Sequence, residues 1–175
     1  MLLKTDRLLI RELTPDDWKF MQKIAADFRR SKYDMPLPIA EAEIIALTKQ
    51  FAETQMFYLV LLHETGIGYI CFHEDNGNYD LGYCFHSDYQ GKGYAFESCG
   101  AIINHVANER NVKAFTAGTA LENWPSRKLL ERLGFTLQKT ECLSFQKDIN
   151  GNDISFEGGI FVKQAGIFPV GERSE

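Results

Sequence analysis

The spacing of apolar residues in the first third of the chain predicts one strand and two helices. Residues 8–13, Leu-Leu-Ile-Arg-Glu-Leu, have the apolar character of a strand. Residues 14–17, Thr-Pro-Asp-Asp, then provide an N-cap, a first-turn proline and acids that complement a helix dipole. On either side of the break at residues 36–38, apolar residues recur at helical spacing: Trp18, Met21, Ile24, Ala25 and Phe28, then Ile44, Leu47 and Phe51. We therefore expect two amphipathic helices after the first strand.

From residue 57 the pattern changes to short apolar runs separated by turn residues. Residues 57–62, 67–72 and 79–85 are rich in aliphatic and aromatic side chains, as strands are. Glu-Thr-Gly separates the first two runs and Asp-Asn-Gly-Asn separates the last two, and both segments are typical of hairpin turns. The pattern predicts an antiparallel meander of three strands.

A glycine-rich turn at residues 90–93 then precedes a new helical pattern. Its apolar residues fall on one helix face: Ala95, Cys99, Ile102, Ile103 and Val106. A strand is predicted next, at residues 112–117. Because two strands joined through a helix run parallel, we expect a local parallel pair here.

The last third of the chain predicts one more helix and a final hairpin. The helix begins at Asn123, with a proline in its first turn. Residues 136–145 and 154–162 are expected to pair around an Asn-Gly turn. Residues 166–175 have no periodicity, so we expect a mobile tail there and a single domain over residues 1–165.

Composition narrows the class of protein. The 175 residues are 45% hydrophobic and 25% charged, which is ordinary for one globular domain. No stretch reaches the roughly 20 apolar residues that span a bilayer, and the first residues lack the apolar core of a signal peptide, so we expect a cytoplasmic protein without a membrane partner. The net charge of −5 argues against a nucleic-acid partner and fits a cationic one, such as an amine.

The four cysteines indicate neither disulfides nor a metal site. Each lies singly in an apolar segment, without a Cys-x-x-Cys pair and without metal-like spacing to the four histidines. We expect reduced, buried thiols and no metal. The four are Cys71, Cys84, Cys99 and Cys142.

The glycine-rich turn carries the strongest chemical signal. A strand that runs into a glycine turn at a helix start presents backbone N–H groups and the positive end of a helix dipole to an anion. Glycines let the backbone approach phosphate oxygens closely, and a lysine adds positive charge. The sequence therefore predicts a phosphate cradle, although an isolated turn of this kind can simply cap a helix. Its residues are Gln90, Gly91, Lys92, Gly93, Tyr94 and Ala95.

This turn and a second motif resemble the GNAT superfamily of N-acetyltransferases over about residues 5–163. Residues 90–95 match its Q/R-x-x-G-x-G/A pattern, which binds the pyrophosphate of coenzyme A, and Asn-Trp-Pro-Ser at 123–126 is similar to its second motif. Thr-Asp-Arg-Leu at 5–8 and Leu-Gly-Tyr at 81–83 further resemble the branch that acetylates ribosomal-protein N-termini. The resemblance implies an α+β fold, with a splayed, mostly antiparallel mixed sheet of about seven strands flanked by about four helices.

The resemblance also implies roles for single residues. It places the backbone of residues 83–85 beside the pantetheine arm, and it makes Ser126 the candidate that protonates the leaving thiolate, because Leu130 occupies the position of the usual tyrosine acid. Asp80 stands where the family often has a glutamate base, with Glu141 as a second candidate. A first-turn serine and a strand-end turn residue are the plain structural alternatives. Beyond the cradle, the implied cofactor-binding residues are Cys84, Phe85, Asn123, Ser126 and Arg127.

The implied reaction is direct acetyl transfer from acetyl-coenzyme A to a primary amine within a ternary complex, by a monomer or homodimer. Only a neutral amine can attack. At pH 7 about one lysine-type amine in 2,500 is neutral but about one α-amine in ten, which favours a protein N-terminal α-amine as acceptor. The alternatives are a small amine, such as an antibiotic, polyamine or amino acid, and a catalytically silent acyl-coenzyme A sensor.

Overall fold

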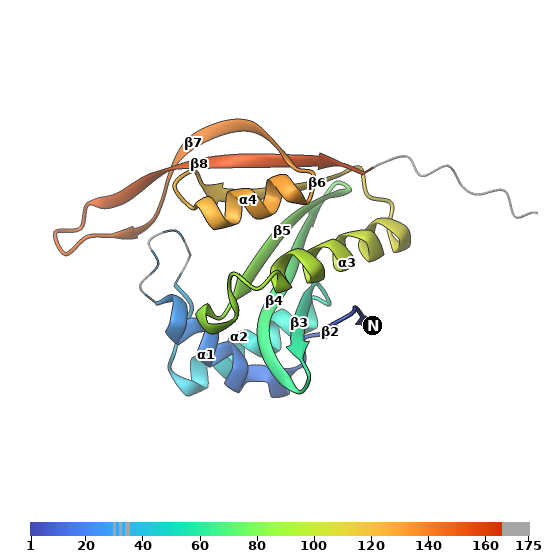
Figure 1. The fold of residues 1–175 in the computed structure, drawn as a ribbon. Coiled ribbons are helices and arrows are strands. Elements are labelled where there is room, and N and C mark those ends of the chain that lie inside the picture. Colours follow the sequence, from blue (N-terminus) through green and yellow to red (C-terminus); the bar gives the residue numbers. More distant parts are fainter. Residues whose placement is uncertain (30, 32, 34–35, 166–175) are drawn as a thin grey trace, which may run out of the picture.

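The computed structural model describes residues 1–29, 31, 33 and 36–165, and the expected tail at residues 166–175 lies outside them. Apart from one short strand near the N-terminus, the strands and helices follow one another in the order that the apolar pattern predicts (Figure 1). The strands are β1 Leu2–Lys4, β2 Leu8–Glu12, β3 Phe57–Leu62, β4 Thr65–Asp75, β5 Asn78–Phe85, β6 Ala114–Ala120, β7 Thr136–Lys147 and β8 Asp153–Gln164. The helices are α1 Trp18–Phe28, α2 Glu41–Glu53, α3 Tyr94–Glu109 and α4 Trp124–Arg132, with short 3-10 turns at Pro15–Asp17 and Ser87–Tyr89.

The described strands form one sheet in the order β1-β2-β3-β4-β5-β6-β8-β7. All neighbours run antiparallel except β5 and β6, the parallel pair that the strand-helix-strand pattern predicts. The fold class is therefore confirmed, with eight strands in the described residues where we expected about seven. The additional strand is β1, which pairs with Leu9–Arg11 of β2.

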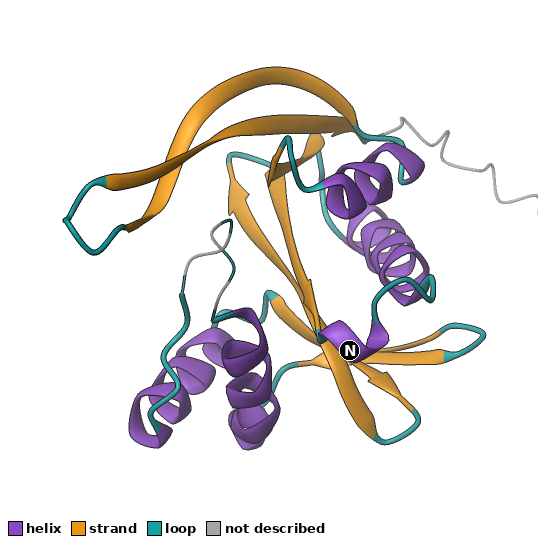
Figure 2. Cartoon of the chain, turned by 60° about the vertical axis from the view of Figure 1, so that its left-hand side comes forward, coloured by secondary structure: helices purple, strands orange, loops and turns teal. Residues whose placement is uncertain are grey.

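Helices cover both faces of the sheet (Figure 2). On one face, α3 and α4 contribute Cys99, Ile102 and Leu130 to the larger core cluster. On the other face, Met21 of α1 and Ile44 of α2 pack against β3 in a smaller cluster. Burial of apolar surface stabilises the sheet from both sides, at about 25 cal/mol per Å² of apolar area removed from water.

The parallel pair β5–β6 holds together over only three residue pairs. Its register runs from Asn78 opposite Ala114 to Asp80 opposite Thr116, and the pairing ends there. Both strands continue: β5 stays paired with β4 as far as Phe85, and β6 stays paired with β8 as far as Ala120. The sheet therefore splays open between β5 and β6.

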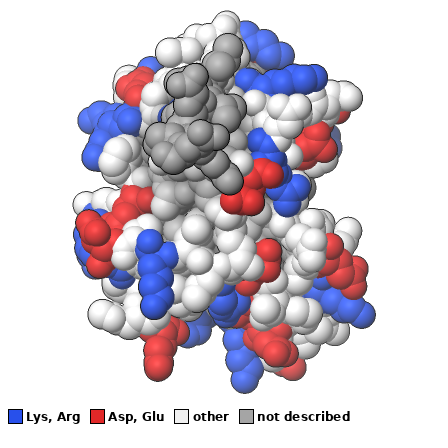
Figure 3. Space-filling model, turned by 90° about the vertical axis from the view of Figure 1, so that its right-hand side faces the viewer, with Lys and Arg blue, Asp and Glu red and all other residues white. Residues whose placement is uncertain are grey.

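Surface charge and hydrophobicity add two observations. On the face that Figure 3 shows, acidic and basic side chains are interspersed. Among the described helices, none is both long and apolar enough to span a membrane.

The cysteines differ from the expectation in part. Cys99 is fully buried in the core and Cys71 and Cys84 are half-buried, but Cys142 is exposed. Cys142 lies on β7, the strand at the edge of the sheet, and belongs to neither of the two core clusters of the described residues. The expectation of burial is wrong for this residue.

Candidate active site

The glycine turn at residues 90–95, called the glycine loop below, adopts a backbone that favours glycine. Gly91 has φ of 71° and Gly93, the N-cap of α3, has φ of 82°. A Cβ at Gly91 would meet no atom within 4 Å, so its left-handed backbone, and not crowding, requires glycine there. The first hydrogen bond across the start of α3 runs from Glu97 N–H to the Gly93 carbonyl. The N–H groups before Glu97 therefore lack helical partners and are available to an anion.

Arg7 fixes the glycine loop from the N-terminal segment. Its Nη1 donates to the Lys92 carbonyl at 3.1 Å, its Nε donates to Glu97 at 2.7 Å, and its guanidinium lies over the Tyr94 ring. Burial raises the pKa of Glu97, but hydrogen bonds from Thr5 and Arg7 outweigh that effect and hold the pKa below its usual range. The Thr-Asp-Arg motif in the sequence does not by itself indicate this contact. The structure shows that it anchors the start of α3.

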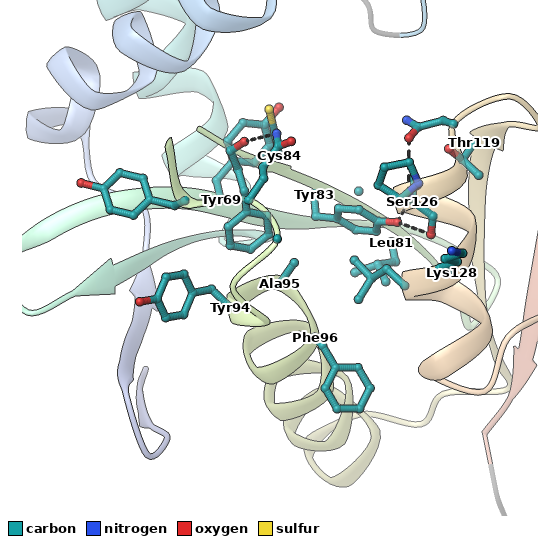
Figure 4. A pocket seen from close by; sticks show the side chains of 18 of the residues that line it. Tyr69, Leu81, Tyr83, Cys84, Tyr94, Ala95, Phe96, Thr119, Ser126 and Lys128 are labelled. Carbon is teal, nitrogen blue, oxygen red and sulfur yellow. Dashed lines mark hydrogen bonds between the residues drawn. The ribbon is translucent and has the colours of Figure 1, made fainter. Parts of the chain in front are cut away.

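A pocket of about 530 Å³ occupies the splay between β5 and β6. The glycine loop, α3 and α4 form one wall, and α1 with the β4 side of the sheet forms the other. Side chains on its walls include Phe28, Tyr69, Cys71, Tyr83, Cys84, Phe85, Gln90, Tyr94, Ala95, Phe96, Asn123, Ser126, Lys128 and Arg132 (Figure 4). Seven of the predicted cofactor-binding positions with side chains thus meet around one cavity, together with Gly91 and Gly93: Cys84, Phe85, Gln90, Tyr94, Ala95, Asn123 and Ser126.

The backbone of β5 is exposed to this pocket. Just past the end of β5, His86 donates its N–H to the Ile67 carbonyl of β4. Every second residue of β5 therefore bonds to β4, and the residues between them direct their backbone N–H and C=O groups toward β6. One of them, Phe85, has its carbonyl held by Gln90 Nε2 at 2.8 Å. The other two are Leu81 and Tyr83, past the point where pairing with β6 ends. Their peptide groups can pair with the amides of a ligand inserted between the strands.

Ser126 lies in the first turn of α4 and faces the pocket. Its N–H donates to Oδ1 of Asn123 at 3.3 Å, so the predicted cap residue does cap this helix. Its Oγ lies 2.8 Å from the hydroxyl of Tyr83, which reaches it from β5 (Figure 4). Sequence reasoning considered the Tyr83 backbone and not its hydroxyl, because no local pattern indicates a contact across 43 residues.

Two cations of α4 line the pocket, and Arg127 does not. Lys128 and Arg132 are on its wall. Arg127 instead lies over the Trp124 ring and donates to the Leu121 carbonyl at 3.1 Å. The predicted cofactor contact of Arg127 therefore does not fit its position.

Lys92 also turns away from the pocket that its neighbours line. Its Nζ donates to the Asp88 carbonyl at 2.8 Å and lies over the Tyr89 ring. Only its carbonyl contributes to the loop, as the acceptor for Arg7. The predicted role of its positive charge at the phosphates is not supported by this placement.

Asp80 marks the point where β5 and β6 separate. It accepts a hydrogen bond from Thr116 Oγ1 at 2.7 Å, within the last register pair of the two strands. Its side chain is exposed and is not on the pocket wall, so the structure gives it a role in joining the strands. Glu141, the second candidate base, is exposed on β7 and pairs with Lys139. In the described residues no group of three or more His, Cys, Asp or Glu side chains is placed to hold a metal ion.

The wall opposite the glycine loop comes from α1 and the segment that follows it. Asp27 accepts hydrogen bonds from the N–H and the hydroxyl of Ser87, which ties the end of α1 to the loop after β5. Tyr33 lines the pocket, donates to Glu122 at 2.8 Å and packs edge-on against Phe156 of β8. Tyr33 thus represents residues 29–39 on the pocket wall, while residues 30, 32, 34 and 35 lie outside the described residues.

Comparisons with known proteins agree with this geometry. The family model of the GNAT acetyltransferase domain matches residues 7–136. YnaD, an uncharacterised N-acetyltransferase of Bacillus subtilis, is 31% identical over 139 residues, which are 77% of this chain and 82% of YnaD. The structure of a GNAT-family acetyltransferase from Bacillus anthracis has a TM-score of 0.80 at 24% identity, over 94% of this chain and 99% of that one.

A second solved structure is similar in fold. It is RimL, an α-N-acetyltransferase of ribosomal protein L7/L12 in complex with coenzyme A, with a TM-score of 0.78 at 16% identity, over 94% of this chain and 98% of that one. Together with the family model, these relatives confirm the resemblance carried by the two motifs. The chain belongs to the GNAT family of acetyltransferases and is an acyltransferase.

Proposed function

We propose that this enzyme transfers the acetyl group of acetyl-coenzyme A to a primary amine by direct attack in a ternary complex, and that the acceptor is a protein N-terminal α-amine. The donor would lie between the glycine loop and α4, with its pyrophosphate at the N–H groups that begin α3. Lys128 and Arg132, on the same wall, supply positive charge for its phosphates.

The two-sided pocket supports a ternary complex. Its donor wall is formed by Gly91, Gly93 and Ser126, and its opposite wall by Phe28 and Tyr69. The β5 backbone lies between the two walls. An amine entering from the second side would meet the thioester at this backbone, where a β5 N–H group can stabilise the oxyanion as it forms. Holding both reactants here makes attack effectively unimolecular.

The observation that carries the acceptor assignment is the absence of a base from the described pocket wall. None of the residues that line it is an aspartate, glutamate or histidine. A lysine-type amine with a pKa of about 10.4 needs such a base near neutral pH, whereas an α-amine with a pKa of about 8 is already neutral in about one molecule in ten. RimL, a protein of the same fold, is named for transfer to an α-amine as well.

The acceptor is tested by thiol release from acetyl-coenzyme A with a matched panel. Peptides that begin with Ser or Ala are compared with the same peptides carrying a blocked N-terminus and an internal lysine, and with spermidine, an aminoglycoside and single amino acids. We expect turnover only with the free peptide N-termini, with mass spectrometry placing the acetyl group on the α-nitrogen.

Other outcomes would assign a different function. Preference for spermidine, an aminoglycoside or an amino acid would make the enzyme a small-amine acetyltransferase. Tight binding of acetyl-coenzyme A without turnover of any acceptor would identify a silent acyl-coenzyme A sensor.

A further inference from the structure

We propose that Tyr83 is the proton source for the leaving coenzyme A thiolate and delivers its proton through Ser126. This inference rests on the proposed acetyl transfer and gives a chemical role to a side chain, that of Tyr83, for which the motifs indicate none. Tyr83 and Ser126 belong to elements on opposite sides of the splay, β5 and α4, and their hydroxyl oxygens lie 2.8 Å apart.

The position of the pair fits this role. Both residues line the pocket, and Figure 4 shows the Tyr83 ring directed across it toward Ser126. The Tyr83 oxygen also lies 3.5 Å from the Ser126 carbonyl, so its hydroxyl is held against the first turn of α4. A coenzyme A sulfur atom beside Ser126 would therefore contact the Ser126 hydroxyl, which in turn contacts the Tyr83 hydroxyl.

The acidity of the two hydroxyls decides which one is the source. A phenol titrates, with an ordinary pKa of about 10, whereas an aliphatic hydroxyl is not among the titrating side chains at all, so Tyr83 is the more acidic of the two. Burial raises the pKa of Tyr83, more than the hydrogen bond with Ser126 lowers it, so the phenol stays protonated at neutral pH. Leu130 of α4 is buried in the protein core, and its side chain has no proton that it could donate.

The step balances without another reagent. The amine lone pair attacks the acetyl carbon, a C–N bond forms, and the C–S bond breaks with its electron pair on sulfur. Sulfur takes the Ser126 proton while Ser126 takes the phenolic proton of Tyr83. The acceptor nitrogen loses its surplus proton to solvent, and solvent returns a proton to Tyr83. The products are the amide and the coenzyme A thiol.

The first experiment compares leaving groups in Tyr83→Phe, Ser126→Ala and the double variant. The acceptor is the best peptide of the panel, and the donors are acetyl-coenzyme A and its selenoester analogue, whose selenolate leaves without a proton. With the thioester we expect Tyr83→Phe to lower kcat by about 100-fold, within the range of general acid catalysis, while KM for the donor changes less than about threefold. With the selenoester the loss should shrink to about threefold.

The variants separate this role from structural ones. The double variant should be no slower than Ser126→Ala, because the two residues act as a unit. Tyr58→Phe, which removes a buried phenol from the core, is the matched control and should change neither rate. Equal losses with both donors would show that Tyr83 only supports the pocket, and unchanged kcat would overturn the proposal. A leaving-group effect in Lys128→Met, absent from Tyr83→Phe, would make Lys128 the proton source.

A second experiment needs no acceptor. Hydroxyls that donate to sulfur lower the pKa of the bound thiol, so coenzyme A should bind more tightly as pH rises from 7 toward 8.5, relative to desulfo-coenzyme A. Calorimetric titrations should show this slope in the wild type and a flatter one in Tyr83→Phe. Equal slopes would overturn the proposal. If no acceptor is turned over but the slopes differ as expected, the proposed function fails while the Tyr83–Ser126 pair stands.

Discussion

Gly93 links the conformation of a single residue to donor binding. Its φ of 82° is a left-handed value, and a Cβ there would lie 3.4 Å from Arg7 Nη2. We expect Gly93→Asp to weaken acetyl-coenzyme A binding at least tenfold, because it adds backbone strain and a negative charge where the phosphates are proposed to bind. Isothermal titration of the folded variant measures the loss.

A second glycine provides the control for strain alone. Gly151 has φ of 85°, in the turn between β7 and β8, and is open to solvent. Gly151→Asp should lower the melting temperature by a similar amount and leave the dissociation constant unchanged. Unchanged affinity in Gly93→Asp would contradict the phosphate site at the glycine loop.

For single residues, the sequence indicates which positions lie at the pocket but not in which direction each side chain points. Ser126 and Asn123 follow from local spacing, since a cap and a first-turn residue are defined by neighbours in the chain. Arg127 and Lys128 are adjacent cations on one helix, and the contacts of Arg127 with the Trp124 ring and the Leu121 carbonyl decide which of them faces the pocket. The Tyr83 hydroxyl depends on a contact across two elements, which no local pattern contains.

Arg7 shows how one side chain connects separate elements of the fold. It joins the segment between β1 and β2 to the glycine loop and α3 through Lys92 and Glu97. We expect Arg7→Ala to weaken acetyl-coenzyme A binding by about three- to tenfold, because one hydrogen bond to the loop at Lys92 and one to Glu97 of α3 are lost. The value of kcat at saturating donor should stay within about twofold. Steady-state kinetics with varied donor separates the two effects.

Lys49→Ala is the matched control for loss of one positive charge, since Lys49 is exposed on α2. It should leave KM for the donor unchanged. Equal KM values in Arg7→Ala and Lys49→Ala would show that the glycine loop keeps its shape without Arg7.

Element prediction succeeds where periodicity is long and weakens where pairing is nonlocal. Helix α3 follows from a clear period of 3.6, and the meander β3 to β5 follows from apolar runs separated by turn residues. Strand β1 has three residues, too few for a period, and exists through its pairing with β2. Strand β6 extends to Ala120, three residues past the predicted end, because β8 continues to pair with it.

The splay is a property of the whole sheet. Neither β5 nor β6 has a sequence that ends its pairing at Asp80 and Thr116, and each continues beside a different partner, β4 or β8. The two halves of the sheet diverge while each keeps its own antiparallel ladder. The strand-helix-strand pattern predicts that the parallel pair exists, whereas its length follows from how the two halves pack.

Thiol accessibility tests this arrangement across the molecule, because the four cysteines sample four environments. We expect Cys142, exposed on β7, to react fast with Ellman's reagent in the native protein and Cys99, at 0% exposure, to react only after unfolding. Cys71 and Cys84 line the pocket and should react slowly, Cys71 the more so because burial, and then the charge of Asp80, raise its pKa to about 12.

Saturating acetyl-coenzyme A, which has no thiol of its own to consume the reagent, should slow Cys84 further by filling the splay. Acetyl-coenzyme A should not change the fast reaction of Cys142, and the substitution Cys142→Ser should remove this fast reaction. Mass spectrometry of the modified peptides assigns each phase to a cysteine. Donor protection of Cys142 instead of Cys84 would place the donor at the edge of the sheet and contradict a site between β5 and β6.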